Sequence, residues 1–315
     1  MTGPSQHLTG PSQQHPKVAA VIVTYNRADK LRTVIKHVLA QNRPADRLVI
    51  VDNASTDHTA EVIAEVAGLE QVQVHRSAVN TGGAGGFATG MQLAYSWGAD
   101  LVWIMDDDCY AQPAALDRLL AGLTRAEQLL AERTPGERVA FAGSLVQWRD
   151  GSICMMNSPP ASDDWAELIV RGAPVTLVDL CSFVSVLIPR WALEAYGLPL
   201  REYFIWFDDA EYTRRIGQGG RGIQVHDSVV LHDLAENKGV NFAHVDAASL
   251  WKFRYGARNE SSYLWHHRGA VHWLEFVLLT AVRMRRGKVA WRYRAVIAGR
   301  ILAGLRFDPK PERVS

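Results

Sequence analysis

LVWIMDDD (residues 101–108) decides the fold, because an apolar run of strand length ends abruptly in three carboxylates. Short apolar runs of this kind are typical of strands buried on both faces of a parallel sheet. Three similar runs precede it: VAAVIV (18–23), LVIV (48–51) and VQVH (72–75). The motifs TYN, VDN, NTGG and DDD therefore follow four predicted strands. In open α/β sheets, ligands bind beyond these carboxyl ends.

Helical patterns lie between the four runs. The first has one apolar face, and Asn26 followed by Asp29 predicts its start; this face carries Leu31, Val34, Ile35, Val38 and Leu39. A second helix follows STD (55–57), and a third runs from NTGGAGG (80–86) to about Trp97. Strands that alternate with helices predict an α/β fold, Rossmann-like, with a mostly parallel central sheet and helices on both faces.

The remaining chain divides at about residue 245. Strand-like segments near 139–148 and 175–188 precede REYFIWFDDAEYTRRI (201–216), in which acidic residues open a helix, and an extended GIQVHDSVVLHD. The chain is then helical and rich in Trp, Tyr and Arg. We predict a disordered tail over residues 1–16, a catalytic domain over 17–245 and a C-terminal helical region over 246–315.

Composition excludes several classes of protein. Of 315 residues, 48% are hydrophobic and 21% charged, which is ordinary for a folded globular chain. A net charge of +1 gives no general attraction to nucleic acid. Three widely spaced cysteines argue against a disulfide framework and a structural zinc site. The sequence shows no signal peptide, no apolar run of the ~20 residues that cross a bilayer, and no GxSxG, Walker A or HExxH motif.

Charge is concentrated at the C-terminal end. From Trp251 onward there are 14 Lys and Arg against four Asp and Glu, whereas the first 250 residues have 20 against 29. One predicted helical face there carries Trp273, Phe276, Val277, Thr280 and Met284. Basic amphipathic helices of this kind bind anionic membranes, so we expect a peripheral membrane contact. The alternative is that these helices pack on the catalytic domain or mediate oligomerisation.

Asp106, Asp107 and Asp108 are the strongest candidate site. Alternate residues of an extended segment point the same way, so Asp106 and Asp108 can face one divalent cation, Mn²⁺ or Mg²⁺, that bridges to a substrate diphosphate. The alternative is a solvated acidic turn. The stretch from Gly83 also matches a dinucleotide fingerprint, but that motif belongs to the first strand–helix turn, and TYN (24–26) has no glycine. A nicotinamide enzyme is therefore rejected, which leaves a flexible loop or a backbone approach to phosphate or sugar.

Asp208 and Asp209 follow the aromatic run YFIWF (203–207). Apolar surroundings and a like-charged neighbour raise a carboxyl pKa, as a general base for a sugar hydroxyl requires. The alternative is an acidic helix N-terminus. Two histidines, His226 and His232, lie in the extended segment that follows, and His232 is the better candidate for a metal ligand.

Five motifs in order, VIVTYNR, VDNASTD, NTGGAGGF, WIMDDD and FIWFDDAEY, resemble the inverting GT-A glycosyltransferases of the family 2 type. More narrowly, they resemble the actinobacterial galactofuranosyltransferases of arabinogalactan synthesis. The resemblance implies UDP-galactofuranose as donor and a polyprenyl-diphosphate-linked GlcNAc–rhamnose acceptor, at the cytoplasmic face of the plasma membrane, in the step that initiates galactan. In the polymerising relatives, paired tryptophans occupy the strand that here reads LCSFVSVLIPR, where Phe183 partly substitutes.

The resemblance also implies site residues. It places the uridine and donor among Thr24, Asn26, Arg27, Asp52, Asn53, Asn80, Gly82, Gly83, Asp106 and Asp107. The metal ligands are Asp106, Asp108 and His232; Asp209 is the base, Asp208 holds the acceptor, and Asn259 lies near the nucleotide. Two alternatives stay open: a rhamnosyltransferase that uses dTDP-rhamnose, and a non-catalytic nucleotide-sugar-binding protein.

Overall fold

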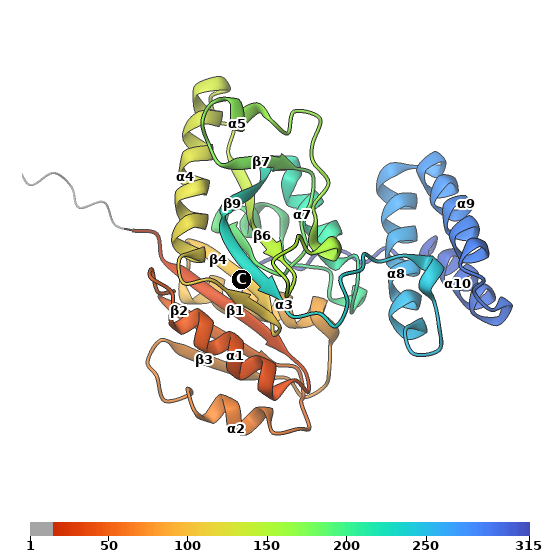
Figure 1. The fold of residues 1–315 in the computed structure, drawn as a ribbon, viewed down its shortest axis with the longest axis horizontal. Helices are drawn as coiled ribbons and strands as arrows, with labels where there is room; N and C mark the ends of the chain where they lie inside the picture. Colours follow the sequence, from red (N-terminus) through yellow and green to blue (C-terminus); the bar gives the residue numbers. More distant parts are fainter. Residues whose placement is uncertain (1–14) are drawn as a thin grey trace, which may run out of the picture.

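The structure, a computed structural model, describes residues 15–315, so the tail predicted over residues 1–16 lies almost wholly outside the described residues. One mixed sheet forms the centre of the molecule (Figure 1). Its strands are β1 (Val18–Thr24), β2 (Arg47–Asp52), β3 (Val72–Arg76), β4 (Leu101–Asp106), β5 (Cys109–Ala111), β6 (Val139–Gln147), β7 (Val175–Val178), β8 (Val186–Pro189) and β9 (Arg221–His232). Their order is β3-β2-β1-β4-β8-β6-β9-β5, and β7 pairs with β9.

The first four strands are parallel, as the sequence predicted. β1 lies between β2 and β4, with Thr24 paired to Asp52 and Val23 to Asp106. Because these strands point the same way and are in step, the motifs that follow them meet at one edge of the sheet. The sheet then continues with β8 antiparallel to β4, β6 antiparallel to β8, and β9 parallel to β6.

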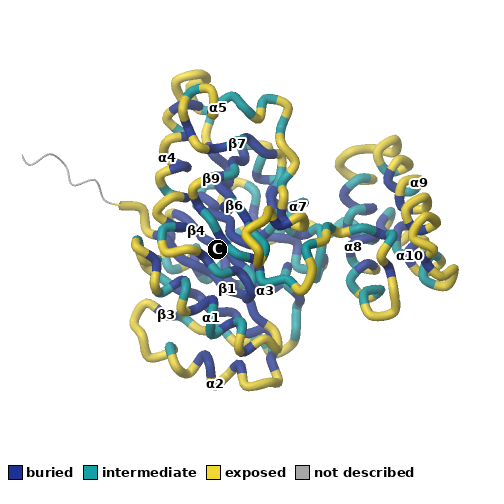
Figure 2. Tube along the Cα trace, in the orientation of Figure 1, coloured by how far each residue is buried: buried dark blue, intermediate teal, exposed yellow. Residues whose placement is uncertain are grey.

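Helices cover both faces of the sheet, which confirms the predicted layers. One face packs against α1 (Ala28–Leu39), α2 (Thr59–Ala64) and α4 (Ala115–Arg133). The other packs against α3 (Gly82–Trp97), α6 (Arg190–Tyr196) and α7 (Asp208–Ile216). Along β1, Ala20 and Ile22 belong to the first core, and Val21 and Val23 to the second, since successive strand residues point to opposite faces. Figure 2 shows the buried sheet between these layers.

A short segment before α4 departs from the expected topology. β5 turns back and pairs antiparallel with the end of β9, with Cys109 opposite His232. The short α5 (Glu167–Val170) lies in the connection between β6 and β7. The start of α1 also differs from the prediction, because Asn26 does not cap it. The carboxylate of Asp57 instead accepts a hydrogen bond from the Ala28 backbone N–H (3.2 Å).

Three further helices, α8 (Leu250–Tyr263), α9 (Ala270–Arg286) and α10 (Trp291–Gly304), form a bundle beside the sheet (Figure 1). The bundle has its own core, in which α8 and α10 pack closely together and α9 contributes Phe276 and Met284. After α10 the chain returns to the body, where the Glu312 carbonyl accepts from the Leu198 N–H (2.9 Å) and Glu312 pairs with Arg201 (2.9 Å). The boundary at residue 245 stays a prediction.

The helical face that we expected to contact a bilayer is instead buried in this bundle. Phe276, Thr280 and Met284 are buried, and Trp273 and Val277 pack against the same core. The prediction of that face was wrong, because one apolar stripe cannot by itself reveal whether protein or lipid covers it. Within residues 15–315, no helix combines the length and the apolar character needed to cross a bilayer.

Candidate active site

A cavity of about 900 Å³ opens at the strand-end edge of the sheet. Of the residues predicted from sequence, it brings together Thr24, Arg27, Asn53, Asn80, Gly82, Gly83, Asp106, Asp107, Asp108, Asp208, Asp209 and His232. Asn26 and Asp52 are not among its lining residues. The opposite wall comes from the bundle: Trp251, Lys252, Arg254, Tyr255, Arg258 and Arg300.

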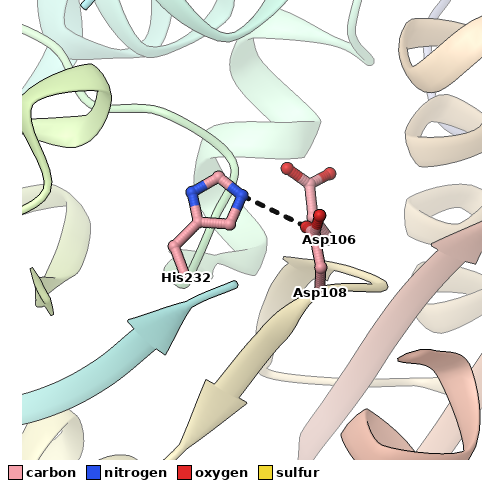
Figure 3. Close-up of side chains that lie close together, drawn as sticks. All are labelled: Asp106, Asp108 and His232. Carbon is pink, nitrogen blue, oxygen red and sulfur yellow. Dashed lines mark hydrogen bonds and ion pairs between the residues drawn. The ribbon is translucent and has the colours of Figure 1, made fainter. Parts of the chain in front are cut away.

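Asp106, Asp108 and His232 converge on one point of this cavity (Figure 3). Each offers one ligand atom, and these atoms lie within 4.8 Å of one another. Asp106 ends β4, Asp108 follows the turn, and the pairing of β5 with β9 brings His232 alongside. The predicted grouping of two carboxylates with this histidine, rather than with His226, is therefore present. His226 lies elsewhere and bonds to Thr176 (2.6 Å).

Asp108 is surrounded by cations. Arg27 Nη1 lies 2.6 Å and Lys30 Nζ 3.2 Å from Asp108 Oδ2, and His232 Nε2 lies 3.1 Å from Oδ1. Burial raises the pKa of Asp108, but the hydrogen bond and charge of His232, with Arg27 and Lys30, hold it well below its usual range. Burial lowers the pKa of His232, yet Asp108 and Asp106 bring it to about 9. Asp108 is thus kept as a carboxylate.

Asp106 is less fully compensated, because the charges of His232 and Arg27 only partly offset its burial. Burial, followed by the charge of Asp108, raises the pKa of Asp106 to about 7. Two carboxylates and an imidazole, with one carboxylate left short of positive charge, fit a divalent cation such as Mn²⁺ or Mg²⁺. The solvated acidic turn is not what the structure shows, since Asp107 and Asp108 are only 5% and 3% exposed.

Asp107 lies beside this group and is held by the first strand. Its carboxylate accepts hydrogen bonds from Thr24 Oγ1 (2.7 Å) and Arg27 Nη1 (3.1 Å). The side chain of Thr24 is therefore committed to Asp107, while the Arg27 side chain is about half exposed at the cavity wall. These contacts join the TYN and DDD motifs directly.

The VDN and NTGG motifs are joined in the same way. Asn53 Nδ2 donates to Asn80 Oδ1 (3.0 Å) and to the Gly82 carbonyl (2.8 Å), and Asn53 Oδ1 accepts from the Thr81 N–H (3.0 Å). Gly82 has φ +72°, and a Cβ there would lie 2.0 Å from the carbonyl oxygen of Phe204. Only glycine permits this approach of the two segments.

Asn26 and Asp52 shape the loop behind the cavity wall. Asn26 Oδ1 accepts from the Thr56 N–H (2.7 Å), and Asp52 Oδ1 accepts from the Ser55 N–H (2.8 Å). Asp52 also lies 3.4 Å from Arg76. Both side chains thus fix the loop over residues 52–57.

Asp208 and Asp209 begin α7 and face the same cavity as the metal-ligand cluster. Burial, and then the charge of Asp209, raises the pKa of Asp208 well above its usual range. Burial also raises the pKa of Asp209, to about 6, although the Ala210 N–H, which donates to its Oδ1 (2.7 Å), and Arg214 oppose the shift. Near neutral pH, Asp209 is therefore mainly ionised, whereas the raised pKa of Asp208 favours its protonated form.

A strained turn before α7 positions this pair. Phe204, Trp206 and Phe207 all have left-handed φ values of 65° to 69°, which cost about 1–3 kcal/mol each in non-glycine residues. The fully buried Asn259 of α8 stabilises the turn, because its Nδ2 donates to the carbonyls of Tyr203 (2.9 Å), Ile205 (3.3 Å) and Trp206 (2.8 Å). Asn259, expected near the nucleotide, thus lies under the turn.

Sequence reasoning missed the wall formed by the bundle. Lys252, Arg254 and Arg300 line the cavity, and within residues 15–315 none of them forms an ion pair with a carboxylate. Phe204 stacks on Tyr255 (4.8 Å between ring centroids) beside them. In the sequence, the basic composition of the C-terminal region was the feature that could have indicated this wall. The predicted Phe183 does line the cavity, packed edge-to-face on Phe87 (5.1 Å).

A protein-family model matches the N-terminal part of the chain. A family model described as glycosyl transferase family 2 matches residues 19–138, which span β1 to the end of α4 and include the DDD motif. This part of the chain is therefore similar to glycosyl transferase family 2. The resemblance read from the five motifs is confirmed at this level.

Curated relatives extend the match beyond that domain. The chain is 32% identical to galactofuranosyltransferase GlfT1 of Mycolicibacterium smegmatis and 34% identical to that of Mycobacterium tuberculosis. Each match covers 64% of this chain, and 66% and 65% of the relatives, so it spans about two thirds of their length. Hyaluronan synthase of Streptococcus pyogenes is 39% identical over 116 residues, 33% of this chain and 26% of its own.

A solved structure of GalNAc-T7 with UDP, GalNAc and Mn²⁺ shares the fold. Its TM-score is 0.58 with 15% sequence identity, over 81% of this chain and 49% of that one. At this identity the likeness concerns the fold alone. It agrees with the α/β architecture predicted from the strand and helix pattern and with the GT-A fold that the motif resemblance implies.

Proposed function

We propose that this chain is a metal-dependent inverting galactofuranosyltransferase with UDP-galactofuranose as donor. One observation carries the proposal: the Asp106–Asp108–His232 group and Asp209 line one cavity at the ends of the parallel strands. The identity with the galactofuranosyltransferases supports the choice of donor. A purely nucleotide-sugar-binding protein would not need Asp209 there.

Asp106, Asp108 and His232 would hold Mn²⁺ or Mg²⁺. When bound there, such a cation neutralises the negative charge of a leaving diphosphate. We assign donor binding to Thr24, Arg27, Asn53, Asn80, Gly82, Gly83, Asp106 and Asp107, with Asn26 and Asp52 shaping the adjacent loop. Arg27 already pairs with Asp107 and Asp108, so it supplies positive charge next to the diphosphate.

Asp209 acts as the general base. Its carboxylate removes the proton from an acceptor hydroxyl while that oxygen forms a bond to the anomeric carbon of the donor. The bond from that carbon to the diphosphate oxygen breaks on the opposite face, so a single displacement inverts the configuration. Asp208 lies beside it and holds the acceptor; its raised pKa favours the protonated form, which can donate a hydrogen bond to an acceptor oxygen.

We further propose that the acceptor is a polyprenyl-diphosphate-linked GlcNAc–rhamnose glycolipid. Support comes from the cavity wall opposite the carboxylates, where Lys252, Arg254 and Arg300 present positive charge. Guanidinium groups bind phosphate through paired hydrogen bonds, which suits a diphosphate between sugar and lipid.

A peripheral contact with the cytoplasmic face of the plasma membrane follows from such an acceptor. The buried face of α9 cannot make that contact, but its other face exposes Val271, Leu274, Leu278, Leu279 and Val282. Trp291 is 80% exposed at the start of α10, and Arg285, Arg286 and Lys288 are exposed beside it. Apolar and basic side chains together favour an anionic bilayer.

Product analysis tests this function. The full-length protein is incubated with a synthetic lipid–diphosphate–GlcNAc–rhamnose acceptor and either UDP-galactofuranose or dTDP-rhamnose, with and without EDTA. We expect one sugar class, galactofuranose, to be transferred, and transfer to stop with EDTA and return with Mn²⁺ or Mg²⁺. Transfer from dTDP-rhamnose alone would make the chain a rhamnosyltransferase. Transfer that EDTA does not reduce would contradict the proposed metal dependence.

A further inference from the structure

Asn157 makes an unusual set of contacts behind the metal-ligand cluster. It ends the short helix η1 (Met155–Asn157) in the connection between β6 and α5 and is only 7% exposed. Its Oδ1 accepts a hydrogen bond from His232 Nδ1 (2.7 Å) and another from Cys154 Sγ (3.0 Å). Its Nδ2 donates to Ser182 Oγ (2.7 Å). Every polar atom of this side chain is therefore engaged.

The bond to His232 decides which ring nitrogen keeps its hydrogen when the imidazole is neutral, as it must be to bind a metal ion. An amide oxygen has lone pairs and no hydrogen, so it can only accept, and His232 Nδ1 must be the donor. In the neutral ring, Nε2 is then the nitrogen with a free lone pair. Nε2 is also the atom that faces Asp108 (3.1 Å) and the cluster with Asp106 (Figure 3).

We propose that Asn157 is the positioning residue for the metal ligand His232. It fixes the tautomer and the orientation of the imidazole, so that Nε2 is presented to a divalent cation held with Asp106 and Asp108. Partners on the far side of a ligating histidine commonly have this role, and their loss weakens metal binding by about 10–100-fold. The inference rests on the metal site of the proposed function.

The surroundings of Asn157 hold it rigidly in this role. The Met155 N–H donates to Asn237 Oδ1 (2.8 Å), and Asn237 Nδ2 donates to the Ile153 carbonyl (3.0 Å). These bonds tie the η1 segment to the chain that follows His232. Ser182, on the other side, lies in the cavity wall next to Phe183. Asn157 thus links His232 to the segment that lines the cavity at Ser182 and Phe183.

Mn²⁺ binding to the full-length protein tests the proposal without any turnover. Affinity is measured from the electron paramagnetic resonance signal of free Mn²⁺, and imidazole coordination from the ¹⁴N modulation of bound Mn²⁺. We expect Asn157→Leu to weaken binding about 10–100-fold and to lose the ¹⁴N modulation. Asn157→Asp, which keeps an acceptor oxygen toward Nδ1, should retain both. Ser182→Ala, the graded control, removes only the contact to Nδ2 and leaves the acceptor toward Nδ1, so it should keep the ¹⁴N modulation and lose far less affinity than Asn157→Leu.

The outcomes separate this inference from the function on which it rests. Wild-type affinity and ¹⁴N modulation in Asn157→Leu would overturn the positioning role. No Mn²⁺ binding by the wild type would instead overturn the metal site itself. If Asn157→Leu does not fold, ¹⁵N spectra of the Mg²⁺-loaded wild type decide, with His232→Gln used to assign the resonance. The proposal requires hydrogen on Nδ1 of His232, and hydrogen on Nε2 would contradict it.

Discussion

The two walls of the cavity are built on different principles. On the strand-end wall nearly every polar side chain already has a protein partner: Thr24 holds Asp107, Asn53 holds Asn80, and Arg27 holds Asp108. On the wall from α8 and α10, the described contacts leave Lys252, Arg254 and Arg300 without a carboxylate. In the proposed function, the first wall holds a small cation and the donor diphosphate, and the second offers its positive charge to the acceptor.

The largest effect is expected from replacing Asp209, the proposed general base in the cavity. Asp209→Asn should lower kcat by about 10²–10⁴-fold, because the amide cannot accept the proton. UDP affinity should be unchanged, since the strand-end contacts remain. Kinetics and UDP titration measure both quantities. Asp227→Asn, an exposed residue of β9, is the control, and near wild-type turnover by Asp209→Asn would place the base elsewhere.

Lowering the pH should progressively protonate Asp209 and so reduce the activity. Burial raises the pKa of Asp209 to about 6, and only its carboxylate form can accept a proton. As pH falls below about 6 the protonated fraction grows, so kcat/KM should fall tenfold per pH unit. A pH–rate profile between 5 and 8 measures this. A profile that stays flat to pH 5 would show that the Asp209 carboxylate does not limit the reaction.

The bundle wall should affect the acceptor and not the donor. Arg254→Gln and Arg300→Gln should each raise the KM for a lipid–diphosphate acceptor about tenfold, since a charged hydrogen bond contributes about 1.5–3 kcal/mol. The KM for the donor should stay constant. Arg292→Gln, an exposed α10 residue outside the cavity lining, is the control. An equal rise in the donor KM would assign these cations to the donor diphosphate instead.

The smallest expected effect concerns the outer face of α9. Leu274→Glu with Leu278→Glu should reduce co-sedimentation with anionic liposomes several-fold, because both side chains are exposed on the apolar stripe. Ile169→Glu with Val170→Glu, exposed on α5, controls for added charge. Point variants are preferable to a truncation, since the segment after α10 packs on the body through Glu312. If both double variants co-sediment equally with the liposomes, the proposed membrane contact of α9 is contradicted.

The sequence predicted the strand-end wall of the cavity much better than the wall from the bundle. Strand ends can be recognised from local sequence. The motifs after β1, β2, β3 and β4 were therefore predicted to meet at one edge of the sheet, with Asp106 and Asp108 close together. Contacts made by distant segments left no local signal. The register of β5 on β9 and the position of Asn259 under the turn at 204–207 depend on such contacts. The prediction for the apolar face of α9 was wrong for a related reason. An apolar stripe predicts that a helix face is buried, but not whether protein or lipid covers it.

The most direct test of the central claim is a crystal structure of the full-length protein with UDP and Mn²⁺, with data collected at the manganese absorption edge. We predict one anomalous peak bounded by Asp106, Asp108 and His232, next to a diphosphate, with the carboxylate of Asp209 facing the same cavity. No peak at these three residues, or Asp209 directed into a separate cavity, would contradict the account.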